Sequence, residues 1–301
     1  MNKNKKWRDF SVAVFILLGF ISSLGGQEVK KPRIYISADL EGIAHVVKDA
    51  HDPSGFEYER ARKLMTGEVN AAIAGCLEAG AVSIVVSDSH GNGLNLIPEE
   101  LNEAAVLVRS FPRPLDMMEG IDETFDGVIL IGCHAKEGTS QSNFSHTMYG
   151  NVGEIKINGT AVSEAHFNAG IAGDFGVPVI MVTGDRPLCE DAKGIFGPIE
   201  TVVSKESLGY FSAKSAHPEI VRKEIREKSK RAVERIREFK PFQFRSPIKL
   251  EITYKNIYDA EVVGYLPCFE RPTAKTVVVE VPNMKKAASV VAALGYVQVK
   301  E

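Results

Sequence analysis

Four side chains that are able to bind a metal ion stand at the points where three β-prone segments of the sequence end. Asp39 and Glu41 follow the first of these segments. His90 follows the second segment, and His134 follows the third. In an Asp-x-Glu pair on extended backbone, both carboxylates point to the same side of the chain. Carboxylate oxygens and imidazole nitrogens suit zinc and leave coordination positions for water, so the sequence predicts a hydrolytic metal site.

The segments that must position these ligands are strongly apolar. Runs of β-forming residues cover 33–39, 82–87, 127–132 and 177–183, and a run with helical spacing covers 57–79. Continuous apolar strands separated by helices are typical of a parallel or mixed sheet that helices cover on both faces. The carboxyl ends of the strands in such a wound sheet meet in one crevice. We therefore expect an α/β fold whose sheet carries the candidate ligands at one edge.

The second half of the chain predicts a hairpin and then a smaller lobe. Asn158-Gly159 between two β-prone runs is a strong hairpin signal, and a helix is expected over 163–175. We interpret residues 27–240 as a metal-binding α/β hydrolase core and residues 241–301 as a C-terminal α/β lobe. The other expected elements are a charged helix over 215–239, strands over 248–254 and 276–281, and a helix over 284–294.

The first 26 residues have the order of a secretory signal peptide. A basic cluster between Lys3 and Arg8 precedes an apolar run from Phe10 to Leu24, and small residues follow it. An uncleaved membrane anchor is the alternative, but the run is shorter than the roughly 20 apolar residues that a spanning helix needs. We expect export to the periplasm or the extracellular space, with no stable membrane span after cleavage of residues 1–26.

The charge of the chain is nearly balanced. Lys and Arg together number 36 and Asp and Glu number 39, which gives a formal net charge of −3. No basic stripe interrupts this balance, so we do not expect a nucleic acid as a partner.

Five separated motifs, in order between residues 33 and 185, resemble the zinc-dependent D-aminopeptidase family. Five motifs in register are far more specific than any one of them. The motifs are Ser37-Ala-Asp39-Leu-Glu41-Gly-Ile, Asp88-Ser-His90, Gly132-Cys-His134-Ala, Ser145-His146-Thr-Met148, and Glu164 with Asn168.

The resemblance implies a role for each matching residue. Asp39 would bridge two zinc ions, and His146 would be the catalytic histidine. The family hydrolyses short peptides with an N-terminal D-amino acid, and it assembles as a ring-shaped homodecamer whose active sites face an internal chamber. The remaining zinc ligands implied by the resemblance are Glu41, His90, His134 and Glu164.

The expected mechanism follows from the chemistry of this set. Two zinc ions polarise the scissile carbonyl group and lower the pKa of water toward ~7. His146, with an unperturbed pKa of about 6.5, is able to take or deliver the proton. Whether His146 acts as a nucleophile or as an acid and base stays open at this point. Asp88 either orients a ligand or is an ordinary turn residue, and Glu68 is interpreted as a solvated or inter-helix polar contact.

Two other functions compete with a peptidase. A two-metal phosphoesterase uses the same kind of carboxylate and imidazole cluster, but it also needs groups that bind phosphate. No glycine-rich phosphate loop follows any predicted strand. An exported protein that only binds a metal or a peptide is the second alternative, and the presence of His146 argues against it because a binding site needs no proton-transfer group.

Overall fold

A seven-stranded sheet forms the centre of the fold. The computed structural model describes residues 31–296, so the predicted signal peptide lies outside the described residues. All neighbouring strands are parallel except the last two, which are antiparallel. The expected mixed sheet is therefore confirmed. Its strand order is β3 (Ala105–Val108), β2 (Ser83–Asp88), β1 (Arg33–Ala38), β4 (Gly127–Cys133), β7 (Val179–Asp185), β8 (Glu200–Gly209) and β9 (Ser212–Ser215).

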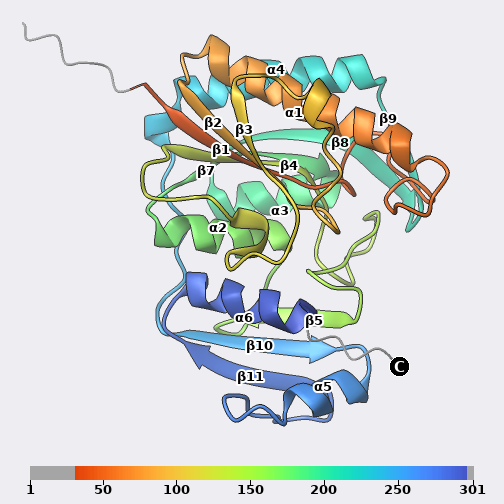
Figure 1. Ribbon diagram of the computed structural model, residues 1–301, viewed down its shortest axis with the longest axis vertical. Helices are drawn as coiled ribbons and strands as arrows, with labels where there is room; N and C mark the ends of the chain where they lie inside the picture. The colour runs from red at the N-terminus through yellow and green to blue at the C-terminus, as the bar shows by residue number, and fades with distance from the viewer. Residues whose placement is uncertain (1–30, 297–301) are drawn as a thin grey trace, which may run out of the picture. The chain divides into compact units, whose positions relative to one another are not determined.

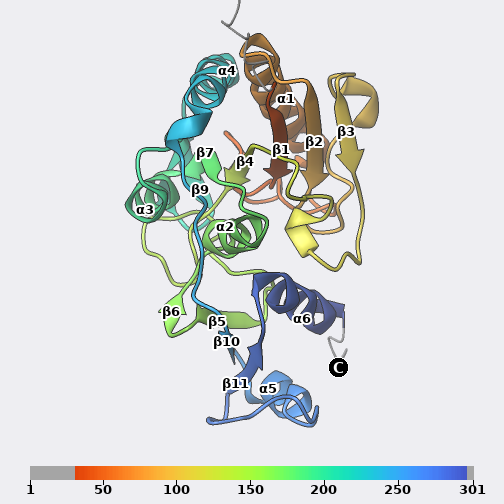
Figure 2. The ribbon, with the colours of Figure 1, turned by 90° about the vertical axis from the view of Figure 1, so that its left-hand side faces the viewer.

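Helices cover both faces of this sheet, as Figures 1 and 2 show. On one face, α1 (Tyr58–Glu78) packs against α4 (Pro218–Glu234). On the other face, α2 (Glu164–Asp174) packs on β4, and α3 (Arg186–Phe196) packs on β7 and β8. Among residues 31–296, no helix is both long enough and apolar enough to cross a bilayer.

A second, antiparallel sheet lies beside the first. Its order is β11 (Thr276–Val281), β10 (Ile248–Tyr254), β5 (Val152–Ile157) and β6 (Thr160–Ala161), so it combines strands from the C-terminal segment with the predicted hairpin. Asn158 and Gly159 have positive φ angles of 51° and 81°, as a tight hairpin turn requires, and the hairpin prediction is confirmed. α6 (Met284–Tyr296) packs on this sheet and on α2, and α5 (Ile257–Val263) packs on β10 and β11.

The strand β8 was not expected from the sequence. Its middle contains Ser204 and Lys205, and both side chains are buried. A strand with polar residues at buried positions lacks the continuous apolar run on which the prediction of the other strands depends. The charged helix predicted over 215–239 is shorter than expected, because α4 ends at Glu234 and a separate 3-10 turn, η3 (Ile236–Glu238), follows it.

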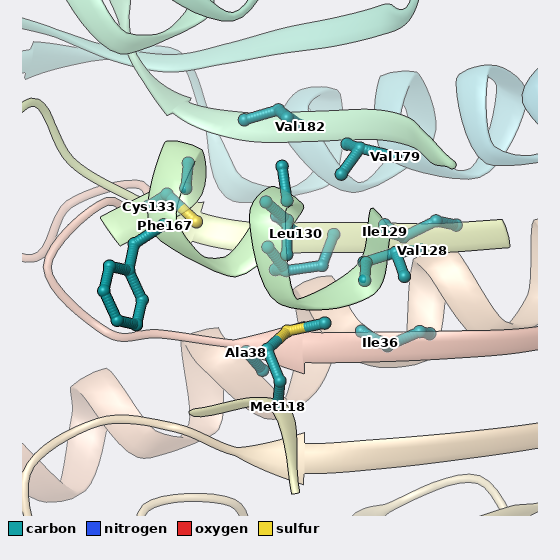
Figure 3. Packing of buried hydrophobic residues seen from close by; sticks show 14 of the residues in the cluster. Ile36, Ala38, Met118, Val128, Ile129, Leu130, Cys133, Phe167, Val179 and Val182 are labelled. Atoms are coloured by element: carbon teal, nitrogen blue, oxygen red, sulfur yellow. The ribbon is translucent and has the colours of Figure 1, made fainter. Parts of the chain in front are cut away.

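The hydrophobic core is continuous from the sheet into the layer that covers it. Figure 3 shows core side chains of β1, β4 and β7 together with Phe167 of α2 and Met118 of η2 (Asp116–Met118). Phe167 and Met118 are completely buried. The short turn η2 is therefore fixed on the sheet by packing, although it has too few residues to be stable alone.

His166 on the first turn of α2 is buried among three phenylalanine rings. Its ring centroid lies 4.8 Å from that of Phe242, 4.9 Å from that of Phe244 and 6.2 Å from that of Phe196. The Nε2 atom has no hydrogen-bond partner among the described residues. Burial, with a smaller contribution from Lys136, lowers the pKa of His166 to about 4. The imidazole is therefore neutral at physiological pH and packs as an apolar ring.

Replacement of His166 by leucine is expected to change how stability depends on pH. The unfolded chain binds a proton at His166 below about pH 6.5, whereas the folded chain binds it only below about pH 4. The folded state of the wild-type chain therefore loses stability as pH falls through this window, and His166→Leu escapes that loss of about 1 kcal/mol at pH 5. Urea unfolding at pH 7.5 and pH 5, with a chelator present, measures the difference.

His45→Asn, a change at an exposed histidine, serves as the control. It should follow the wild-type pH dependence. Equal losses of stability in His166→Leu and the wild-type chain would contradict the assignment of a neutral, buried His166.

Candidate metal centre and active site

The three strands that end in candidate ligands are direct neighbours in the sheet. β1 lies between β2 and β4, and Ala38 at its end pairs with Asp88 of β2 and Ile131 of β4. Asp39, His90 and His134 therefore leave the sheet at the same edge, as the sequence predicted. Glu164 reaches this edge from the first turn of α2, where Ser163 caps the helix by accepting the N–H of His166.

The carboxylate of Asp39 lies between two imidazole rings. Its Oδ1 atom is 3.3 Å from Nδ1 of His90, and its Oδ2 atom is 3.6 Å from Nε2 of His134. Each imidazole also faces a second carboxylate. His90 Nδ1 is 2.7 Å from Oε2 of Glu41, and His134 Nε2 is 3.3 Å from Oε2 of Glu164. The five residues thus form two ligand groups that share Asp39.

Several atoms in this cluster are buried and have no hydrogen-bond partner within residues 31–296. They include Oδ2 of Asp39, Oε2 of Glu41 and Nε2 of His134. Buried polar atoms without partners are costly, and bound cations would satisfy them. Two ligand atoms of a tetrahedral zinc ion, each about 2.0–2.1 Å from the metal, are roughly 3.3 Å apart. The separations in the cluster are close to this value, so the residues fit the expected metal.

The outward nitrogen of each histidine is held by a backbone carbonyl group. Nε2 of His90 is 2.6 Å from the carbonyl oxygen of His51, and Nδ1 of His134 is 3.0 Å from that of Ala135. A carbonyl oxygen only accepts, so each of these nitrogens carries the proton. The opposite nitrogen faces the cluster, and loss of its proton would give the tautomer that a metal ligand requires.

The ionisation of the cluster follows from burial and close charges. Burial and the nearby Glu41 raise the pKa of Asp39 well above its usual range. Burial alone lowers the pKa of His134, but the carboxylate of Glu164 outweighs burial and raises that pKa to about 10. The pKa of His90 is likewise raised well above its usual range, by Glu41 and Asp39 against the effect of burial. Protons on the imidazoles balance the carboxylates here, and a bound metal takes the place of those protons.

His146 differs from His90 and His134 because it is more accessible. Its side chain is 22% exposed, whereas that of His134 is 1% exposed. The two rings stack with centroids 4.2 Å apart, and Nε2 of His146 lies 3.5 Å from Oε1 of Glu164. The carbonyl oxygen of Phe144, 2.8 Å from Nδ1, fixes the ring and leaves Nε2 free to accept a proton.

A cavity of about 170 Å³ opens beside the cluster. His146 and the three carboxylates of the cluster line one part of it. The sequence did not predict the residues that complete the wall, because they lie in loops and at a helix end without a periodic pattern. The main members of this second group are Phe111, Asp116, Met117, Met148, Tyr149 and Tyr296.

Asp88 supports the site through the backbone and does not touch the imidazole of His90. Its carboxylate accepts the N–H groups of Asn95 and Leu96 at 2.6 and 2.7 Å. The amide of Asn95 in turn donates to the carbonyl oxygen of His90 at 2.6 Å. Asp88 therefore holds the loop that carries His90.

Glu68 and Lys205 fix the loop that carries Glu41. The expectation of a solvated or inter-helix Glu68 is wrong, because its buried carboxylate accepts the N–H of Ala44 at 2.9 Å. Lys205 is buried beneath the same loop, and its Nζ atom donates to the carbonyl oxygens of Glu41 and of Val46. Burial lowers the pKa of Lys205 to about 8, and the nearby Asp185 and Glu41 limit that decrease.

The chain is similar to known D-aminopeptidases over most of its length. A family model described as D-aminopeptidase matches residues 33–293. A D-aminopeptidase of Bacillus subtilis (strain 168) is 33% identical over 247 residues, which cover 82% of this chain and 90% of that protein. The solved structure of the Zn-dependent D-aminopeptidase DppA from Bacillus subtilis, described as a self-compartmentalizing protease, superposes with a TM-score of 0.85 at 30% identity. That match covers 89% of this chain and 100% of the other.

Replacement of Lys205 by methionine is expected to destabilise the chain and to weaken metal binding. Methionine fills similar space but leaves the carbonyl groups of Glu41 and Val46 without a donor, a loss of about 2 kcal/mol in the free energy of unfolding. The loop then no longer holds the carboxylate of Glu41 in place. Urea unfolding and titration with Zn²⁺ measure the two effects. Lys214→Met, at an exposed lysine of β9, is the control, and wild-type Zn²⁺ affinity in Lys205→Met would contradict the positioning role.

Proposed function

Because the chain belongs to the D-aminopeptidase family and is thus a peptidase, we propose that it is a dinuclear zinc enzyme. In this proposal it removes an N-terminal D-amino acid from short peptides. Asp39 would be shared by the two ions, Glu41 and His90 would complete one site, and His134 and Glu164 would complete the other.

The position of the Asp39 carboxylate is the observation that carries this proposal. One of its oxygens faces His90 and the other faces His134, at 3.3 and 3.6 Å. A carboxylate that serves one metal ion has no need of a second imidazole on its far side. The description of the related Bacillus enzyme as Zn-dependent supports the choice of metal.

Zinc, when bound, acts as a Lewis acid that polarises a carbonyl group and lowers the pKa of water. Side chains of the protein provide metal binding, substrate orientation and proton transfer. The buried carboxylates would hold the ions, and the adjoining cavity would orient the peptide beside them. Nε2 of His146 takes a proton from the attacking group or gives one to the leaving amine, because the carbonyl oxygen of Phe144 holds Nδ1 in its protonated form.

The cavity itself disfavours the phosphoesterase alternative. Among the described residues that line it, none is Lys or Arg. Arg113 lies near the cavity, but it donates to Ser87 Oγ and to the carbonyl oxygen of Asp88 and stacks on Phe111. A site of this kind lacks the cationic clamp that phosphoryl transfer requires.

The proposal also covers the oligomeric assembly and the cellular location of the enzyme. The related Bacillus protease is described as self-compartmentalizing, and we propose a homodecameric ring with the active sites facing an internal chamber. We also propose export through residues 1–26, which would bring the enzyme near peptidoglycan, a source of D-amino acids. Sedimentation of residues 27–301 tests the assembly, and fractionation of cells tests the export. Monomers in solution would argue against the ring, and an intact leader in the cytosol would argue against export.

The number of zinc ions per chain tests the shared carboxylate. We expect two in the wild-type protein, about one in Glu41→Ala, and almost none in Asp39→Ala, because only Asp39 serves both ions. Elemental analysis after exhaustive dialysis measures these values. Glu103→Ala removes an exposed carboxylate and should retain two ions. A single ion in the wild-type chain, or two in Asp39→Ala, would refute the bridge.

Replacement of His146 by alanine separates catalysis from metal binding. We expect His146→Ala to retain its zinc but to lose roughly 10²- to 10⁴-fold in kcat for a D-alanyl anilide, because proton transfer is removed. The matched L-alanyl anilide and a nitrophenyl phosphate identify the substrate class of the wild-type enzyme. Hydrolysis that is unchanged in His146→Ala would exclude the proposed role, and preferential phosphate hydrolysis would favour the phosphoesterase.

A further inference from the structure

Asp116 places a fourth carboxylate in the cavity, outside the metal cluster. Its side chain lies in η2 and lines the cavity together with Asp39, Glu41 and Glu164. Only 7% of the residue is exposed. The hydroxyl group of Tyr149 donates to its Oδ2 atom at 3.1 Å.

No cationic side chain in the described part of the chain forms an ion pair with this carboxylate. Among the described residues, no nitrogen of Lys, Arg or His lies within 4.0 Å of the Asp116 oxygens. Arg113, three residues earlier, directs its terminal nitrogens to Ser87 and to the backbone of Asp88. Burial raises the pKa of Asp116 to about 6, so the group is still mainly ionised at neutral pH. A buried, ionised carboxylate that faces a cavity and forms no ion pair with the described residues is complementary to a cationic ligand.

The backbone holds Asp116 in a fixed and uncommon conformation. Its φ angle is 51°, in the left-handed region that few residues other than glycine adopt. The next carbonyl oxygen, that of Met117, accepts hydrogen bonds from Ser37 Oγ at 3.1 Å and Ser89 Oγ at 2.9 Å. These bonds tie η2 to the ends of β1 and β2. The carboxylate is therefore positioned before a ligand arrives.

We propose that Asp116, held by Tyr149, binds the α-ammonium group of the substrate. This inference rests on the proposed function, in which Asp39, Glu41 and Glu164 are occupied by metal and Asp116 is the carboxylate left free in the cavity. A peptidase that acts at the N-terminus must recognise a free ammonium group, which carries a positive charge and three N–H donors. That group is separated from the scissile carbonyl by a single carbon atom, so its receptor must share the cavity with the metal cluster.

Binding of D-alanine and of propionate to the zinc-loaded full chain tests the proposal, because these two ligands differ only in the ammonium group. Calorimetry measures both affinities without turnover. We expect the wild-type protein to prefer D-alanine by roughly tenfold to a hundredfold, as a hydrogen bond between charged groups provides. In Asp116→Asn the ratio of D-alanine affinity to propionate affinity should fall toward one, with zinc content and propionate affinity unchanged. kcat/KM for the D-alanyl anilide should fall by a similar factor.

Two further variants control for indirect effects. Glu123→Gln neutralises an exposed carboxylate in the following loop and should keep the wild-type ratio. Tyr149→Phe keeps the charge of Asp116 but removes the hydroxyl that holds it, so the ratio should fall by a smaller factor. If Asp116→Asn does not fold, Tyr149→Phe is the variant that tests the proposal. An unchanged ratio of D-alanine affinity to propionate affinity in Tyr149→Phe would then overturn the proposal.

The remaining outcomes separate this inference from the proposed function. A wild-type preference for D-alanine that persists in a folded Asp116→Asn overturns the role of Asp116. Loss of zinc from Asp116→Asn also overturns it, because the residue would then support the metal. A wild-type chain that prefers D-alanine but hydrolyses no D-alanyl anilide refutes the proposed function alone, and the ammonium site stands.

Discussion

Burial of the Asp39 carboxylate is the constraint on which the rest of the site depends. An ionised carboxylate in the interior is stable only when cations or donors surround it. Asp39 meets an imidazole on each side because β1 has a parallel neighbour on each side, and both neighbours end at the same level. An edge strand would offer one such neighbour. The strand order of the sheet is thus a condition for a carboxylate that is shared between two ligand groups.

Polar contacts below the cluster keep each ligand in place. Lys205 supports the backbone of Glu41, Asp88 supports the loop of His90 through Asn95, and the cap of α2 fixes Glu164. Lys205 comes from β8, which holds no candidate ligand, whereas Asp88 and the cap Ser163 lie just before the ligands that they support. The supporting groups are buried, and they contact backbone atoms more than ligand side chains. A conventional hydrophobic core would pack as well, but it would not fix the direction of the loops.

The sequence predicted the parts of the site that follow regular patterns. Asp39, His90 and His134 were found because apolar strands precede them and strand ends of a wound sheet converge. Glu164 begins a helix, so only the family resemblance identified it. Asp116 was missed because a three-residue turn has no periodicity and its left-handed backbone leaves no mark in composition. Lys205 was missed with its strand, since a buried lysine interrupts the apolar pattern. The lobe boundary near residue 240 stays a prediction.

The carboxylate of Glu164 has two partners of different kinds. Its Oε2 atom faces His134, and its Oε1 atom accepts the N–H of Met148 at 2.6 Å. The loop that includes Met148 also carries His146 and the hydroxyl group that holds Asp116. The two oxygens of one carboxylate therefore join the metal cluster to this loop, and both contacts are present together. A single side-chain orientation thus sets the spacing between the candidate metal ligands, the proton-transfer group and the proposed substrate anchor.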